Sequence, residues 1–180
     1  MIRLFVALGI PDIVRAGLSV ICGGLPGARW VAPENFHLTL RFIGEVDDGD
    51  IQEIDEAFSR VSASPIAVSL AGVGYFGRGR ATRALWVKVV PSPELESLGS
   101  KVELALVRAG CPPESRKFVP HITLARFRRA QSQLVEQFVA DHALFKLGPF
   151  PARTFLLNSS THRLAGTIYT VEAEYSLNQP

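Results

Sequence analysis

The chain has 180 residues, of which 47% are hydrophobic and 20% are charged, so it can bury one substantial core but is too short for two large domains. Its formal net charge is only +2, so bulk charge neither requires nor excludes a nucleic-acid partner. The two cysteines, Cys22 and Cys111, are far apart and form no CxxC pair, which argues against a disulfide framework or a zinc cage and fits a reducing cytoplasm.

The apolar pattern predicts short strands alternating with helices along the chain. In chain order we expect strand 2–9, helix 12–23, strand 35–43, helix 48–62, strands 65–74 and 83–90, helix 94–109, strand 118–127, helix 131–141, and strands 144–157 and 166–175. Short connections within two strand pairs favour antiparallel pairing over a doubly wound parallel sheet. No apolar run reaches membrane length, so the sequence predicts an α+β protein that does not span a membrane.

Two of the expected strands carry the same short motif. Residues 37–40 read His-Leu-Thr-Leu and residues 121–124 read His-Ile-Thr-Leu, and the two histidines are 84 residues apart (121 − 37), about half the chain. A duplicated unit would leave such a repeat. We therefore expect residues 1–180 to form one bilobal domain with an internal pseudo-repeat.

Each motif places a histidine and a threonine on the same face of a strand. Side chains at i and i+2 point the same way, so His37 lies beside Thr39 and His121 beside Thr123. A single such pair is common on any half-solvated strand and indicates no function by itself. If two lobes face each other, the two pairs can flank one phosphate, with one imidazole as base and the other as acid near neutral pH. The repeated motif therefore predicts phosphoryl transfer without a metal.

Metal binding is the competing interpretation of the two histidines. Glu34 precedes the first motif, but no Asp or Glu lies near His121, and the sequence contains neither an HExxH motif nor a His/Cys cluster. We expect no metal and no other cofactor. The remaining histidines are isolated, His142 at the expected end of a helix and His162 in a polar loop, and neither is assigned a catalytic role.

With its paired motifs, the sequence resembles the two-histidine (2H) phosphoesterase superfamily, specifically the RNA 2',3'-cyclic phosphodiesterase (2'-5' RNA ligase) family. The similarity covers nearly the whole chain. Besides the motifs it includes the opening strand 3–7, the flanks of the first motif within 30–46, a Trp-bearing strand at 84–86, the residues from 120 through 126, and a closing hairpin at 159–169.

The resemblance implies a fold, a reaction and a set of site residues. The implied fold is α+β and bilobal, with two similar lobes of mostly antiparallel sheet and outer helices around a central cleft. The implied reaction hydrolyses a terminal 2',3'-cyclic phosphate of RNA to a 2'-phosphate, with reversible ATP-independent 2'-5' RNA ligation at the same site. By resemblance, His37 is the general acid, His121 is the general base, and Thr39, Thr123 and Arg126 hold the phosphate.

Arg126 is the site residue that strand geometry does not predict. Strict alternation would place it on the opposite face from His121 and Thr123, so its assignment requires the strand to end or bulge after the motif. It also begins the basic stretch 126–129, which together with the arginines in 78–83 is a candidate contact for RNA phosphates. Exposed arginines that serve only solubility are the alternative.

Two further patterns are interpreted as structural. Residues 72–77 spell GxGxxG, but another strand-like run follows where a dinucleotide fold needs a helix, so we expect a hairpin loop. Four phenylalanines close to the motifs are expected in the core rather than as stacking platforms for bases: Phe36, Phe42, Phe118 and Phe127.

Two other functions stay open at this point. One is a cyclic phosphodiesterase acting on small nucleotide derivatives, and the other is a catalytically silent RNA-binding module. Paired imidazoles favour catalysis, because binding alone gains little from them. The expected partner is RNA with 2',3'-cyclic phosphate ends, and the expected state is a cytoplasmic monomer.

Overall fold

The computed structural model describes residues 1–163 and 166–178. Its elements are β1 (Ile2–Gly9), α1 (Asp12–Ser19), β2 (Arg29–Trp30), η1 (Pro33–Asn35), β3 (His37–Val46), α2 (Asp48–Ser59), β4 (Ile66–Phe76), η2 (Gly79–Ala81), β5 (Ala84–Val89), α3 (Pro93–Arg108), β6 (His121–Arg126), α4 (Ser132–Asp141), β7 (Lys146–Ala152), β8 (Thr154–Arg163) and β9 (Gly166–Ser176).

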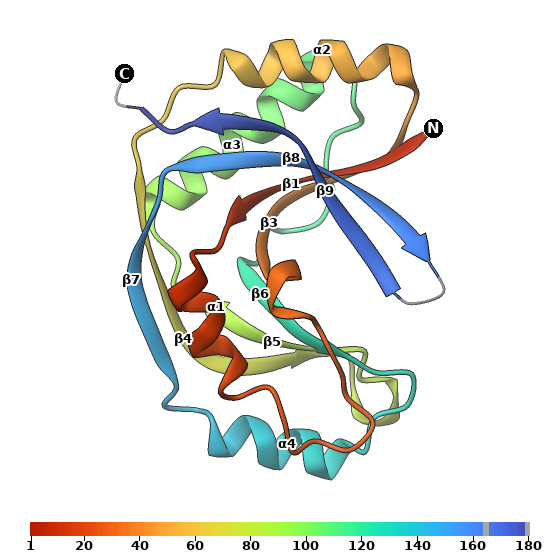
Figure 1. Ribbon diagram of the computed structural model, residues 1–180, viewed down its shortest axis with the longest axis vertical. Coiled ribbons are helices and arrows are strands. Elements are labelled where there is room, and N and C mark those ends of the chain that lie inside the picture. The colour runs from red at the N-terminus through yellow and green to blue at the C-terminus, as the bar shows by residue number, and fades with distance from the viewer. Residues whose placement is uncertain (164–165, 179–180) are drawn as a thin grey trace.

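Nine strands of the described residues form one sheet in the order β7-β4-β5-β6-β3-β1-β8-β9, with β2 paired to β6, and every pairing is antiparallel. The sheet divides into two lobes (Figure 1). The first lobe contains β1, β3, β8 and β9 with helices α2 and α3, and the second contains β2 and β4 to β7 with helices α1 and α4. The predicted fold class, α+β with two lobes of mostly antiparallel sheet, is confirmed.

The core lies between the sheet and its helices. Helix α3 begins where the hydroxyl of Ser92 accepts a hydrogen bond from the backbone N–H of Leu95 at 3.2 Å, a typical N-cap. The helix then buries one face with residues spaced three and four apart, namely Leu95, Leu98, Val102 and Leu106. No helix in the described residues is long and apolar enough to cross a membrane.

The expected strand 144–157 is wrong, because the chain forms two strands there. β7 pairs with β4 in the second lobe, whereas β8 pairs with β1 and β9 in the first, and Arg153 separates them. β7 contains Pro149 and Pro151, which lack a backbone N–H, and such a strand is tolerated at the edge of a sheet where β7 lies.

Two smaller expectations also differ from the structure, and one short strand was not expected. The first helix ends at Ser19 rather than 23, just before a turn in which Gly24 has a φ of +71°. The backbone of His162 belongs to β8 and not to a loop, whereas its side chain lies outside what the structure describes. The two-residue strand β2 was not expected at all.

The GxGxxG segment lies in a hairpin, as expected, and no α-helix follows it before β5. Most of it is strand rather than loop, however, because β4 extends to Phe76. Gly74 is required there because the ring of Trp86 lies directly over it, and a Cβ at this position would be 2.6 Å from the ring. The glycine thus allows Trp86 to lie flat across β4.

Candidate active site

The two motifs meet in the middle of the sheet. β3 and β6 are joined by a single residue pair, Leu38 with Ile122, and each of these residues directly follows a motif histidine. Leu38 and Ile122 are both fully buried, whereas the histidines and threonines of the motifs are only partly buried. The predicted alternation therefore holds in both strands, and we call the face that carries the four polar side chains the site face.

The two imidazoles are held in the same way. Nδ1 of His37 lies 2.7 Å from the carbonyl oxygen of Asn35, and Nδ1 of His121 lies 2.7 Å from the carbonyl oxygen of Val119. Because a carbonyl oxygen only accepts, each Nδ1 carries a proton and donates it. This assignment leaves Nε2 of both rings available, as a base when neutral and as an acid when protonated.

Aromatic rings surround both histidines. The ring of His37 packs against Phe5 at 4.8 Å and Tyr169 at 5.1 Å between centroids. The ring of His121 packs against Phe76 at 4.9 Å and Trp86 at 5.9 Å. Burial among these rings lowers the pKa of both imidazoles below the usual 6.5. The positive charge of Arg126 lowers the pKa of both further, so this guanidinium lies close enough to act on the two rings together.

A β-bulge places Arg126 on the site face. The register between β5 and β6 shifts by one residue after Thr123, which makes Leu124 an extra residue on β6. Such a bulge reverses the facing of every later side chain in the strand. Ala125 is accordingly buried, and Arg126 is exposed on the side of Thr123. The assignment of Arg126 required the strand to end or bulge after the motif, and the strand does bulge there.

The first motif has the same irregularity. The register between β1 and β3 shifts at Leu40, the residue that corresponds to Leu124. Arg41 consequently points toward α3, where its Nε donates to Glu103 at 2.6 Å. Phe42 turns to the site face, where it is 50% exposed, so its expected core position is wrong. The three other phenylalanines are buried or packed against the core, namely Phe36, Phe118 and Phe127.

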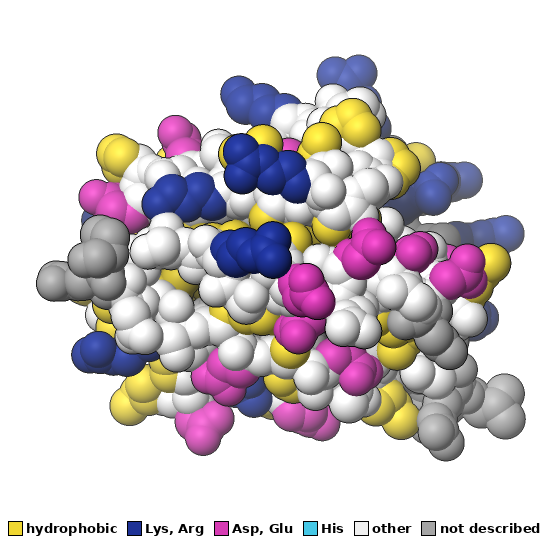
Figure 2. All heavy atoms as spheres, turned by 90° about the horizontal axis from the view of Figure 1, so that it is seen from above, with side chains coloured by type: hydrophobic (Ala, Val, Ile, Leu, Met, Phe, Trp, Pro, Cys, Tyr) yellow, Lys and Arg dark blue, Asp and Glu magenta, His cyan; other side chains and the backbone are white. Residues whose placement is uncertain are grey.

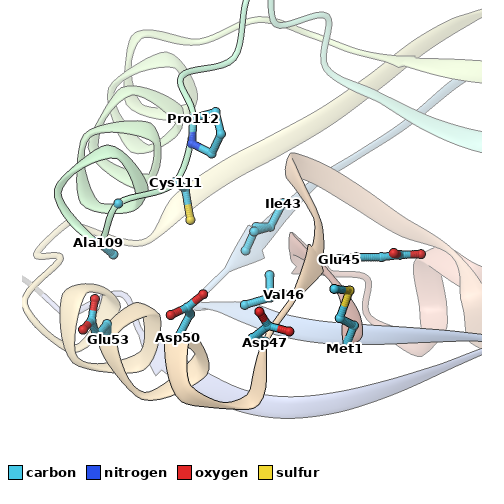
Figure 3. Close-up of a pocket in the computed structure, with 11 residues that line it drawn as sticks. Met1, Ile43, Glu45, Val46, Asp47, Asp50, Glu53, Ala109, Cys111 and Pro112 are labelled. Atoms are coloured by element: carbon cyan, nitrogen blue, oxygen red, sulfur yellow. The ribbon is translucent and has the colours of Figure 1, made fainter.

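Neither a metal site nor the pocket of Figure 3 competes with this arrangement. No group of three His, Cys, Asp or Glu side chains in residues 1–163 and 166–178 converges to hold a metal ion. The pocket, of about 300 Å³, lies where β3 ends and α2 begins (Figure 3). Four carboxylates line it, from Glu45, Asp47, Asp50 and Glu53, and these repel phosphate.

The remaining isolated histidine, His142, ends α4 as expected and stacks on Phe138.

Comparison with known proteins shows to which protein family this chain belongs. The model of the LigT like phosphoesterase family matches the chain twice, over residues 8–86 and 87–169. The chain belongs to this phosphoesterase family. Each of the two matched segments contains one of the His-x-Thr motifs.

Relatives of this LigT-like phosphoesterase share most of its length. A protein of Thermotoga maritima is 38% identical over 175 residues, which cover 94% of this chain and 92% of the relative. A protein of Archaeoglobus fulgidus is 32% identical over 170 residues, covering 93% and 96%. Both relatives are named RNA 2',3'-cyclic phosphodiesterase.

Solved structures agree with the fold of this LigT-like phosphoesterase. A protein of Thermus thermophilus superposes with a TM-score of 0.81 at 26% identity, covering 98% of both chains. Escherichia coli LigT complexed with 3'-AMP superposes with a TM-score of 0.80 at 26% identity, covering 99% of both chains. The fold of this chain is therefore shared with both solved structures.

The aromatic neighbours of the histidines and one basic residue were not predicted from the sequence. Phe5 and Tyr169 come from strands far apart in the sequence, and only the pairing order of β3, β1, β8 and β9 brings them to His37. Arg29 lies on β2, directly opposite Arg126.

Proposed function

We propose that this phosphoesterase hydrolyses the terminal 2',3'-cyclic phosphate of RNA to a 2'-phosphate by two-histidine acid-base catalysis. The observation that carries the proposal is the matched pair of imidazoles, each fixed through Nδ1 with its Nε2 left available, on a strand face that also carries a threonine. The names of the relatives from Thermotoga maritima and Archaeoglobus fulgidus support the same substrate.

The proposed reaction uses one proton transfer at each histidine. Neutral His121 takes a proton from water through Nε2, and the water oxygen attacks phosphorus in line with the 3'-oxygen. The bond from phosphorus to the 3'-oxygen breaks, and protonated His37 donates its Nε2 proton to that oxygen. Thr39, Thr123 and Arg126 hold the nonbridging oxygens, where negative charge increases. A 5'-hydroxyl that attacks phosphorus in place of water would use the same acid and base and would form a 2'-5' linkage, so ligation is part of the proposal.

Phe42 gives this site a feature suited to nucleotides. Its ring is 50% exposed on the site face and contacts Phe5, which in turn packs against His37. Exposed aromatic rings beside cationic side chains are the usual way in which proteins bind unpaired bases. The arrangement supports a nucleotide substrate over an inorganic or sugar phosphate.

Turnover of an oligonucleotide with a 2',3'-cyclic phosphate end tests the proposal directly. We expect hydrolysis by the purified protein, with a 2'-phosphate as the product in phosphorus NMR. EDTA should leave the rate unchanged, because the two imidazoles supply both proton transfers. A 3'-phosphate product would show that the acid and base roles are reversed, and activity lost to EDTA and restored by a metal would contradict the two-histidine mechanism.

The pH dependence provides a second test. The proposal needs one neutral and one protonated imidazole, so kcat/KM should follow a bell-shaped profile. Because the pKa of each histidine in the free protein is below its usual 6.5, the maximum of kcat/KM should lie below pH 6.5. The bound phosphate anion raises both pKa values again, so kcat should peak at higher pH than kcat/KM. A kcat/KM maximum on the alkaline side of 6.5 would contradict this.

A further inference from the structure

We propose that Arg29 binds the internucleotide phosphate on the 5' side of the terminal nucleotide, and so makes the end of an RNA chain a better substrate than a mononucleoside cyclic phosphate. The inference rests on the proposed function and adds the second phosphate of its substrate. It assigns a role to β2, a strand of only two residues that no other part of the mechanism uses.

The pairing of β2 with β6 sets the direction of Arg29. Arg29 lies opposite Arg126, and Trp30 lies opposite Ala125. Trp30 packs against Phe138 of α4 with ring centroids 5.9 Å apart, on the side of the sheet that the helix covers. Since neighbouring residues of a strand point to opposite faces, Arg29 points to the site face, as Arg126 does.

Two arginines opposite each other are unfavourable unless an anion lies between or beside them. The ion pairs of the described residues involve Arg15, Arg41, Arg60 and Arg116, and neither Arg29 nor Arg126 takes part in one. Both side chains belong to exposed residues. A cross-strand pair of accessible guanidinium groups with no carboxylate partner in the described structure is suited to phosphate.

The charges of the surrounding strands favour the same location. The five strands of the second lobe, β2 and β4 to β7, contain no Asp or Glu, whereas α2 of the first lobe is rich in both. The end of the molecule formed by α2 shows acidic side chains together with Lys and Arg side chains (Figure 2). A polyanion that leaves the histidines along the strands of the second lobe would thus meet no carboxylate from these strands.

Arg29 and Arg126 are placed for different phosphates. Arg126 lowers the pKa of His37 and His121, and Arg29 is not among the described charges that do so. Arg29 lies one strand further from the histidines than Arg126. Arg126 is therefore in position for the reacting phosphate, and Arg29 for the phosphate one nucleotide away.

Two substrates that differ by one phosphate test the inference: a nucleoside 2',3'-cyclic phosphate with and without a 5'-phosphate. We expect Arg29→Gln to lower the ratio of kcat/KM between the phosphorylated and unphosphorylated substrates by about tenfold or more, the usual scale of a lost charge-assisted contact. Arg29→Lys should restore part of the ratio because it keeps the charge. Arg108→Gln, which removes an exposed arginine from the last turn of α3, should leave the ratio unchanged.

The outcomes separate this inference from the function on which it rests. Equal losses of kcat/KM on both substrates, or no loss on either, would overturn the role of Arg29 while leaving the phosphodiesterase activity established. If the unaltered protein turns over neither substrate, the proposed function fails. Equilibrium binding of nucleoside 2'-phosphates with and without a 5'-phosphate then still decides whether Arg29 recognises the second phosphate.

Discussion

Replacing either His37 or His121 with alanine should lower turnover of a 2',3'-cyclic-phosphate RNA by at least about a hundredfold, the usual scale of a lost general acid or base. In the proposed reaction, Nε2 of each histidine carries out one of the two proton transfers, and each change removes one of these atoms. Because the two histidines act in the same step, the double variant should be little slower than either single variant. Single-turnover rates at saturating substrate measure the effect on the chemical step.

The design needs controls for folding, because both imidazoles pack against aromatic rings. His37→Gln and His121→Gln keep more of the side-chain volume and should show the same loss. His142→Ala removes a histidine that stacks on Phe138 at the end of α4 and should keep near-normal turnover. Thermal unfolding of each variant shows whether its fold is intact. A His37 or His121 variant that has the same unfolding temperature as the unaltered protein and keeps full activity would exclude that residue from catalysis.

Replacing Arg126 with glutamine should lower kcat by about a hundredfold, the scale observed when one stabilising contact to a developing negative charge is lost. The change should also move the pH profile, because Arg126 lowers the pKa of both His37 and His121. Without this positive charge the two pKa values rise, so both limbs of the kcat/KM profile should shift to higher pH. The pH–rate profile of the variant checks both expectations.

The variant Arg126→Lys distinguishes the effect of the positive charge from the effect of the guanidinium's hydrogen bonds. It should keep the pH profile near its original position but recover only part of the rate, since lysine cannot form the paired contact of a guanidinium. Arg153→Gln, an exposed arginine between β7 and β8, is the matched control and should change neither quantity. A loss of rate without any shift in the profile would place Arg126 away from the imidazoles.

The His-Thr pairs could be predicted from sequence because they depend on local geometry alone. Residues two apart in a strand share a face whatever the strand pairs with. The residue between each pair, Leu38 or Ile122, faces the opposite side of its strand and is fully buried. That these two residues pair with each other was not predictable, because a contact between strands depends on the whole sheet order.

The bulges mark the limit of this reasoning. A one-residue bulge depends on the register with the partner strand and leaves no clear trace in the strand's own sequence. For this reason alternation alone could not place Arg126 on the site face, which the bulge at Leu124 does. The core position expected for Phe42 is wrong because of the corresponding bulge at Leu40. Arg29 was missed for a related reason, since two residues are too few to show a periodic pattern.

The chain crosses from one lobe to the other between a strand and the helix that follows it. β1 belongs to the first lobe and α1, which follows it, to the second; β5 belongs to the second lobe and α3, which follows it, to the first. Residues 1–86 alone therefore complete neither lobe, because β8 would be missing beside β1 and β6 beside β5. This is the arrangement expected when the two chains of a domain-swapped dimer become fused end to end. A fragment ending near residue 86 would expose unpaired strand edges, so we expect it to associate with a second copy rather than fold alone.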